Sequence, residues 1–207
     1  MVATDTRQEI LATSARLFAE RGLVGTTMRA IAEECGIQAA SLYHHFGSKD
    51  ALIAEIMTRS SEHVVGLYDQ IRAADLEPVA RFKALIRATL ENFHQYPDAA
   101  QMFYDNDSYV AEAPELQRVR DDAEANDLLW VKTIHETLAC GQLRTDIKPA
   151  RLKVLLRNMI WSTTRGLRRG KASGEIADQV VALLLHGCLV STENGSRVDE
   201  AGRAHPR

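Results

Sequence analysis

Residues 41–52, with the sequence SLYHHFGSKDAL, place one tyrosine and two histidines side by side, followed by a phenylalanine and a glycine. Adjacent histidines suit a helix core poorly, but their ring nitrogens and the tyrosine hydroxyl can hydrogen-bond groups outside the protein. From Gly36 to Lys49 the chain contains no acidic residue, so this stretch does not repel a phosphate. The residue types favour a contact with nucleic acid, and the competing interpretation is a solvated turn between two helices.

The overall composition limits the classes of protein to which the chain can belong. Its 207 residues are 45% hydrophobic and 26% charged, which is ordinary for a globular protein. The formal net charge is −3, so any DNA-binding surface must be local. Three widely spaced cysteines without a C-x-x-C pattern lead us to expect no metal and no cofactor. The N-terminus lacks an apolar signal core, and the longest apolar run is too short to span a bilayer. We therefore expect a cytoplasmic protein without membrane contact.

Three short helices are predicted within the first fifty residues. Asp5 is the expected cap of the first helix, and Gly22 ends it. Two threonines then cap a second helix that stops at Gly36, and a tight turn leads into the third. The second and third helices therefore form a helix-turn-helix arrangement, in which Leu42 and Phe46 are the expected core contacts of the third helix.

The outer side of the third helix is suited to the major groove of DNA. With its two core residues turned inward, Ala40 and His44 point away from the protein, and Ser41 and Tyr43 lie on the flanks. These side chains are small or polar and none is acidic, as a helix that contacts base edges requires. Lys49 lies in the first turn of the next helix, where a cation opposes the helix dipole. We therefore expect Lys49 to gain little from its own fold and to meet a phosphate.

The rest of the chain is predicted to be helical, because apolar residues recur at helical spacing and no alternating run indicates a strand. The expected fold class is all-α, with further helices at residues 49–73, 77–95, 97–106, 114–140, 149–168 and 174–192. The chain divides into a DNA-binding domain over 1–50, a helical domain over 51–193 and a tail over 194–207. The tail lacks apolar periodicity, so we expect it to be disordered.

Residues 10–53 resemble the N-terminal domain of the TetR family of transcriptional repressors. The resemblance is carried by the segments LFAERG, GTTMRAIA, SLYHHF and SKDAL, with GI at the turn, and it covers about a quarter of the chain. It implies an all-helical homodimer in which the first domain binds double-stranded DNA at a palindromic operator. The second domain would bind a small-molecule effector and form the dimer.

The resemblance also assigns DNA-contacting positions in this sequence. Residues expected to meet the DNA backbone are Thr27, Arg29, Tyr43, His45 and Lys49. Residues expected at or near the bases are Gln38, Ala39, Ser41 and His44. The sequence departs from many relatives at two positions, where alanine replaces a polar or basic residue and a glycine: Ala39 and Ala40. Since alanine offers only an apolar contact to a thymine methyl group, the operator sequence does not follow from these residues.

The predicted helix at 149–168 has an aliphatic stripe along one side. The stripe consists of Leu152, Leu155, Leu156, Met159 and Thr163. The last predicted helix, which includes Val180 and Leu184, is apolar nearly all round and must be covered on more than one side. Both helices could complete the core of one protomer, or they could form a four-helix interface with two helices from each subunit. The family resemblance favours the dimer.

The opposite side of the same helix carries Arg157 and Trp161 one turn apart, with Asn158 beside them. A guanidinium inside a bundle is costly without a partner, and the internal acids that could supply one are Asp105, Asp107 and Glu136. Alternatively, an anionic ligand meets Arg157 while its apolar part lies on Trp161. Further residues could line such a pocket, although a set of this kind is more often plain core: Phe93, Met102, Phe103, Tyr104, Trp130 and Ile134.

A second resemblance concerns the ligand. The stretches LRNMIWSTTRGL, QMFYDND and LACGQLRTD resemble the branch of the TetR family that responds to acyl-CoA thioesters in bacterial lipid and steroid breakdown. This resemblance implies that Arg157 and Trp161 contact the ligand. A CoA thioester also suits the residues, because its phosphates fit an arginine and its acyl group fits an apolar bundle. The sequence therefore predicts a repressor that a small molecule, with a CoA thioester as candidate, releases from its operator.

Two other classes of protein compete with this interpretation. The stretch HETLAC at 135–140 nearly forms a zinc-protease H-E-x-x-H motif, but Ala139 stands where the second histidine is needed. Neither a nucleophile-elbow motif nor a phosphate-binding or dinucleotide-binding glycine motif is present, so we expect no enzyme. The other competitor is a helical adaptor that binds a protein partner and not DNA.

Overall fold

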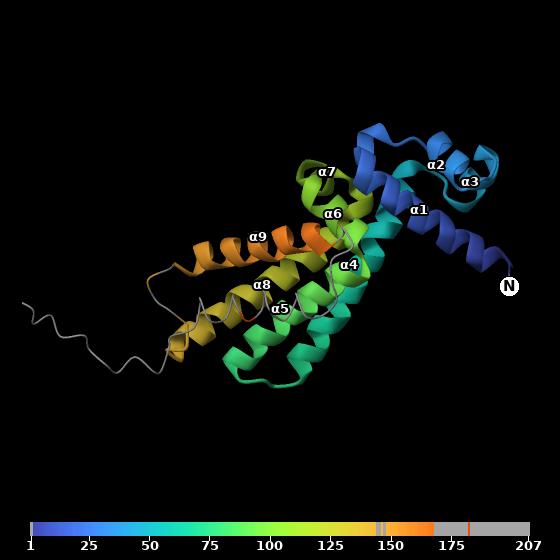
Figure 1. Cartoon of the computed structure of the whole chain (residues 1–207). Helices are drawn as coiled ribbons and strands as arrows, with labels where there is room; N and C mark the ends of the chain where they lie inside the picture. Colours follow the sequence, from blue (N-terminus) through green and yellow to red (C-terminus); the bar gives the residue numbers. More distant parts are fainter. Residues whose placement is uncertain (1, 144–145, 147, 168–181, 183–207) are drawn as a thin grey trace, which may run out of the picture.

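The computed structural model describes residues 2–143, 146, 148–167 and 182. The elements formed by the described residues are all helices, in agreement with the expected all-α class, and Figure 1 shows their arrangement. The N-terminal helices are α1 (Val2–Gly25), α2 (Met28–Glu34), α3 (Ala39–His45) and α4 (Lys49–Ala73). The remaining elements are α5 (Pro78–Gln95), α6 (Pro97–Asp105), α7 (Asp107–Glu112), the 3₁₀ helix η1 (Pro114–Leu116), α8 (Gln117–Ala139) and α9 (Pro149–Leu167). Apart from residue 182, the predicted last helix and the tail, with Val180 and Leu184, lie outside the described residues.

The small N-terminal unit closely follows its predicted plan. α1 begins at Val2 and not at Asp5, but Gly22 interrupts it with φ 78° and ψ 163°, a left-handed conformation that favours glycine. Thr27 caps α2, because its hydroxyl oxygen accepts a hydrogen bond from the Ala30 N–H at 3.2 Å. The predicted cap is confirmed, and the first helix does break at Gly22. Its predicted start was wrong, and its end lies at Gly25 and not at the break.

The third helix, α3, turns its apolar side into the core as expected. Leu42 is fully buried and Phe46 is 3% exposed, in a cluster that also contains residues of α1, α2 and α4. Ser48 caps α4 by accepting a hydrogen bond from the Ala51 N–H at 3.0 Å. The burial of these two residues fixes the rotation of α3 and so decides which of its side chains face outward.

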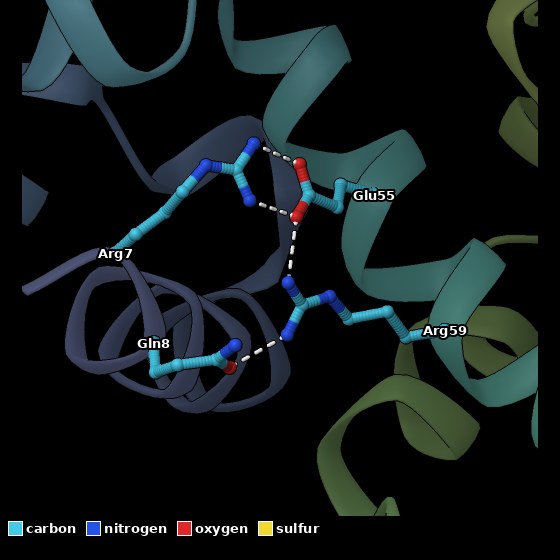
Figure 2. Close-up of polar contacts among 4 residues, drawn as sticks. All are labelled: Arg7, Gln8, Glu55 and Arg59. Carbon is cyan, nitrogen blue, oxygen red and sulfur yellow. Dashed lines mark hydrogen bonds and ion pairs between the residues drawn. The ribbon is translucent and has the colours of Figure 1, made fainter. Parts of the chain in front are cut away.

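A polar clamp ties α1 to α4 (Figure 2). Arg7 donates from both guanidinium amino groups to the Glu55 carboxylate, and Arg59 donates to the same carboxylate at 2.9 Å and to the Gln8 side-chain oxygen at 2.6 Å. The Arg7 guanidinium also lies 4.5 Å from the centre of the Phe46 ring, a cation–π contact. Hydrogen bonds from Arg7 hold the pKa of Glu55 below its ordinary value. Because Phe46 follows α3, the clamp joins three helices of the N-terminal unit.

The second unit is a bundle in which α4, α5, α8 and α9 run side by side (Figure 1). α4 begins in the small unit and continues into this bundle without a break. The predicted helix at 114–140 is wrong at its start: Pro114 opens a 3₁₀ turn, and α8 begins after it. The short helix α7 was not predicted. No helix among the described residues has the length and apolar character needed to cross a membrane.

Candidate DNA-binding surface and effector cavity

The outer side of α3 presents polar side chains to solvent. Its exposed residues are Gln38, Ala40, Ser41, Tyr43 and His44, and Tyr43 is 52% exposed. Ala39 and His45 are half-buried, and Ala39 packs against the core. The prediction that the side bearing Ala40 and His44 faces outward is therefore confirmed. What the exposed residues contact remains a prediction.

Thr27 and Arg29 lie at the start of α2, and both are exposed. The Arg29 side chain donates to Glu33 at 2.9 Å, in an ion pair whose partners are 85% and 65% exposed. Exposed pairs of this kind contribute little stability and exchange readily for another anion. The geometry therefore leaves Arg29 available to a DNA phosphate.

Lys49 has a structural role that the sequence did not predict. Its ammonium group donates to the Leu23 carbonyl oxygen at 2.6 Å and to the Thr26 carbonyl oxygen at 3.1 Å. The Leu23 carbonyl lies in the last turn of α1 and the Thr26 carbonyl lies directly after that helix, and both approach α4 only in the folded chain. The expectation that Lys49 gains little from its own fold was thus wrong, and one of its three N–H groups remains for a phosphate.

A cavity of about 680 Å³ lies within the bundle, with walls from α4, α5, α6, α8 and α9 and from the first residue of α7. Seven of the nine predicted ligand-binding residues line it: Phe93, Phe103, Tyr104, Trp130, Arg157, Asn158 and Trp161. The other two do not, because Met102 and Ile134 are each 1% exposed and pack in the cores. Periodicity placed both on an inner face, but the cavity occupies only part of that face.

Aromatic rings form one wall of the cavity. Tyr104 stacks on Trp161 with ring centres 4.7 Å apart, and Phe93 packs edge-on against both rings. Burial raises the pKa of Tyr104 to about 12, so its hydroxyl stays protonated in neutral solution. This wall offers flat apolar surface and no negative charge.

Arg157 is exposed at the cavity wall on α9. Among the described residues it has neither a hydrogen bond nor an ion pair. Glu136, one of its three candidate internal partners, pairs instead with Arg81 at 2.8 Å. The remaining charged groups in the cavity wall are one more cation and three carboxylates: Lys153, Asp107, Glu124 and Asp127. Because Lys153 pairs with Asp127, Arg157 is the cation with the most capacity for an anionic ligand.

Sequence reasoning missed the polar side chains of the cavity wall. Asn92 is 5% exposed and donates from its amide nitrogen to the Ser60 hydroxyl oxygen at 3.1 Å. The Asn126 side-chain oxygen is buried and has no partner among the described residues. Both Ser60 and Asn92 sit at helical spacing from core residues, three positions after Met57 and seven after Leu85. A polar residue within an apolar stripe was the available signal.

The predicted dimer face divides in two. Leu152 and Leu156 are each 2% exposed and pack in the protomer core, so their assignment to the dimer interface was wrong. Leu155 and Met159 are 44% and 41% exposed and remain candidates. The side chain of Thr163 lies outside the described part of the chain. The stripe read from the sequence was wider than one helix face, and its inner edge faces α5 and α8.

Comparisons with known proteins agree with this geometry. Residues 10–56 match the family described as bacterial regulatory proteins, tetR family. The chain is 30% identical to the HTH-type transcriptional repressor KstR2 of Rhodococcus jostii (strain RHA1) over 190 residues, which are 91% of this chain and 93% of that protein. The structure of KstR2 of Mycobacterium tuberculosis superposes with a TM-score of 0.82 at 27% identity, covering 89% of this chain and 95% of that one.

A third solved structure shares the fold. AibR, determined in complex with isovaleryl coenzyme A and operator DNA, has a TM-score of 0.71 at 20% identity and covers 87% of this chain and 98% of its own. The family match falls on the helix-turn-helix unit, and the similarity to KstR2 extends through the bundle with its cavity. The chain therefore belongs to the TetR family of transcriptional regulators, a family of DNA-binding regulators and not of enzymes.

Proposed function

We propose that this protein is a homodimeric repressor that leaves its operator when a CoA thioester occupies the bundle cavity. The observation that carries the proposal is the combination of Arg157, without a partner among the described residues, and an aromatic wall in one cavity of about 680 Å³. A CoA thioester combines negatively charged phosphates with an apolar acyl group. Arg157 suits the phosphates, and the wall formed by Phe93, Tyr104 and Trp161 suits the acyl group.

The relatives support the two halves of this proposal to different degrees. KstR2 of Rhodococcus jostii is named a transcriptional repressor and matches nearly the whole chain, which supports repression. AibR binds isovaleryl coenzyme A and operator DNA on the same fold, so the fold can accommodate both ligands. At 20% identity, this likeness does not support the assignment of the same ligand to this chain. The assignment of a CoA thioester therefore depends on the cavity residues.

The proposed contact with DNA needs two copies of the chain. In a symmetric dimer the two α3 helices would enter successive major grooves, about 34–36 Å apart, of a palindromic operator. Exposed apolar side chains on α9, Leu155 and Met159, are candidates for the interface. Since a bacterial regulator acts on chromosomal DNA, its place of work would be the cytoplasm.

Release would follow from a difference in affinity. A ligand that binds better to the subunit spacing that does not fit DNA shifts the population toward that spacing. α4 is the element that both sites share, because it begins beside α3 and lines the cavity further along.

A gel-shift titration with the region upstream of the protein's own gene tests the proposal. Octanoyl-CoA should release the protein from this DNA, whereas octanoate with free CoA should not. Arg157→Ala should weaken octanoyl-CoA binding about tenfold, the order expected when a charge-assisted hydrogen bond is lost. Arg151→Ala removes the same charge from an exposed position on α9 outside the cavity, and this control should release like the wild type.

Two results would contradict the proposal. Two cavity carboxylates, Asp107 and Glu124, could attract a cation, so thermal stabilisation by a planar aromatic cation and by no CoA thioester would reverse the effector class. Absence of any shift with operator-length DNA from the upstream region would favour the adaptor over the regulator.

A further inference from the structure

A polar bridge joins α4 to α5 in the wall of the cavity. Asn92 of α5 donates from its side-chain nitrogen to the Ser60 hydroxyl oxygen of α4 at 3.1 Å. Its side-chain oxygen lies 3.0 Å from the His63 Nδ1 atom. Because the amide oxygen can only accept, His63 must donate from Nδ1. The bridge therefore fixes the donor and acceptor role of each atom in it.

With the donors and acceptors of the bridge assigned in this way, two of its hydrogen atoms are left without an acceptor among the described residues. The Ser60 oxygen accepts from Asn92, but its own hydrogen has no acceptor among the described residues, and neither does the second hydrogen of the Asn92 amide. Other hydroxyls in the same wall use theirs: Thr89 donates to the Leu85 carbonyl oxygen at 2.8 Å, and Ser61 donates to the Asp122 carboxylate at 2.8 Å. Ser60 and Asn92 line the cavity and are 8% and 5% exposed. The pair thus offers donors to a ligand oxygen.

Asn126 of α8 offers the complementary group. Its side-chain oxygen is buried without a partner in the described part of the chain, although the residue lines the cavity. A buried acceptor without a partner is rare in folded proteins, since leaving one unpaired costs about 1–3 kcal/mol. A ligand N–H would satisfy it.

The register of α4 and α8 places Asn126 about one helical turn further along the bundle than Ser60. Asp122, one turn before Asn126, bonds Ser61, the neighbour of Ser60. Further along the same two helices, the Trp130 indole N–H donates to the Tyr68 hydroxyl at 2.8 Å. Asn126 falls between these two contacts, so it is level with the turn of α4 that follows Ser60. One helical turn rises about 5.4 Å, which an amide group with its flanking carbons spans.

We infer that the cavity binds an amide of the effector's pantetheine arm through a polar wall. This polar wall consists of Ser60, Asn92 and Asn126. The amide C=O would accept from Ser60 or Asn92, and the amide N–H would donate to Asn126. The inference rests on the proposed function, because it takes the effector to be a CoA thioester, whose pantetheine arm carries two amides. A free fatty acid has no amide, so this contact would favour a CoA thioester over the free acid alone.

The test compares octanoyl-CoA with two analogues, each with one pantetheine amide N–H replaced by an ester oxygen. Affinities are measured by titration calorimetry on the full-length protein. Wild-type protein should bind one analogue about tenfold more weakly than octanoyl-CoA, the order expected for a buried acceptor left unpaired. In Asn126→Leu this difference should disappear. Ser60→Ala should weaken octanoyl-CoA binding about threefold or more, while Ser108→Ala, at an exposed position on α7 outside the cavity, should bind like the wild type.

Thermal unfolding without ligand shows whether Asn126→Leu still folds. Asn126→Leu removes a buried group that has no partner, so without ligand its unfolding temperature should not fall below that of the wild type. If both analogues bind wild type as tightly as octanoyl-CoA does, or if the difference persists in Asn126→Leu, the inference is overturned while the proposed function stands. If no CoA thioester binds or releases DNA, the proposed function fails and the inference falls with it.

Discussion

Replacing Lys49 with methionine should destabilise the protein as well as weaken its binding to DNA. The change keeps most of the apolar stem and removes the ammonium group that donates to the Leu23 and Thr26 carbonyl oxygens at 2.6 and 3.1 Å. Hydrogen bonds to a charged group contribute about 1.5–3 kcal/mol each when buried, and Lys49 is only half-buried. We therefore expect a loss of about 2 kcal/mol for the two together.

The loss is measurable by thermal unfolding. For a chain of about 200 residues, a change of 1 kcal/mol moves the unfolding temperature by about 2–4 °C, so Lys49→Met should lower it by about 4–8 °C. Operator affinity should fall too, because the turn that Lys49 holds leads directly into Thr27, the cap of α2. A phosphate contact through the remaining N–H is measured separately. Its loss would reduce the slope of log affinity against log salt concentration by about 0.9 per protomer.

The matched control is Lys132→Met on α8. Lys132 is exposed and its ion pair with Glu136 is 3.9 Å long, so the change should cost less than about 0.5 kcal/mol. An unfolding temperature of Lys49→Met within about 1 °C of the wild type would refute the structural role of Lys49, whatever happens to DNA binding.

Three further outcomes are expected. Tyr43→Ala should weaken DNA binding about three- to tenfold for all sequences alike in titrations at fixed salt; a change confined to one operator would instead make Tyr43 a base-contacting residue. Glu55 has a pKa below its ordinary value, so its bonds with Arg7 stabilise the fold above the unfolded pKa of about 4.3 and are lost as pH falls through the lower folded pKa. Glu55→Gln should therefore flatten the acid side of the stability curve measured by urea unfolding, and an unchanged acid side would contradict the clamp. Leu155→Lys with Met159→Lys should shift the sedimentation coefficient from dimer to monomer if these exposed residues form the interface; an unchanged dimer would exclude them.

Local rules were enough to predict most of the helix plan and the rotation of α3. The cap at Thr27, the break at Gly22 and the inward side of α3 depend on neighbours within one or two turns, and such signals are present in any short window of sequence. Leu42 and Phe46 could be placed in the core for the same reason. The rings of the cavity wall were also found, because helical spacing put them on inner faces.

Contacts between distant segments could not be predicted. Lys49 bonds carbonyls that lie 26 and 23 residues earlier in the chain, and no periodicity reveals that approach. Leu152 and Leu155 belong to one apolar stripe in the sequence, yet only the packing of α9 on α5 and α8 buries the first and leaves the second exposed. Whether an inner residue meets a cavity or a core, as with Met102, depends likewise on several helices at once.

The helix α4 connects the proposed DNA-binding surface directly to the proposed effector cavity. Lys49 at its start holds the turn before α2, Glu55 holds α1, and Ser60 lines the cavity. Eleven residues separate Lys49 from Ser60, which is about 16 Å along a helix. Because a helix is a rigid element over that distance, a ligand that binds Ser60 would act on the same element that positions the DNA-binding unit. A variant that loses the Ser60 contact but still binds ligand through Arg157 should therefore retain occupancy and lose part of the release from DNA.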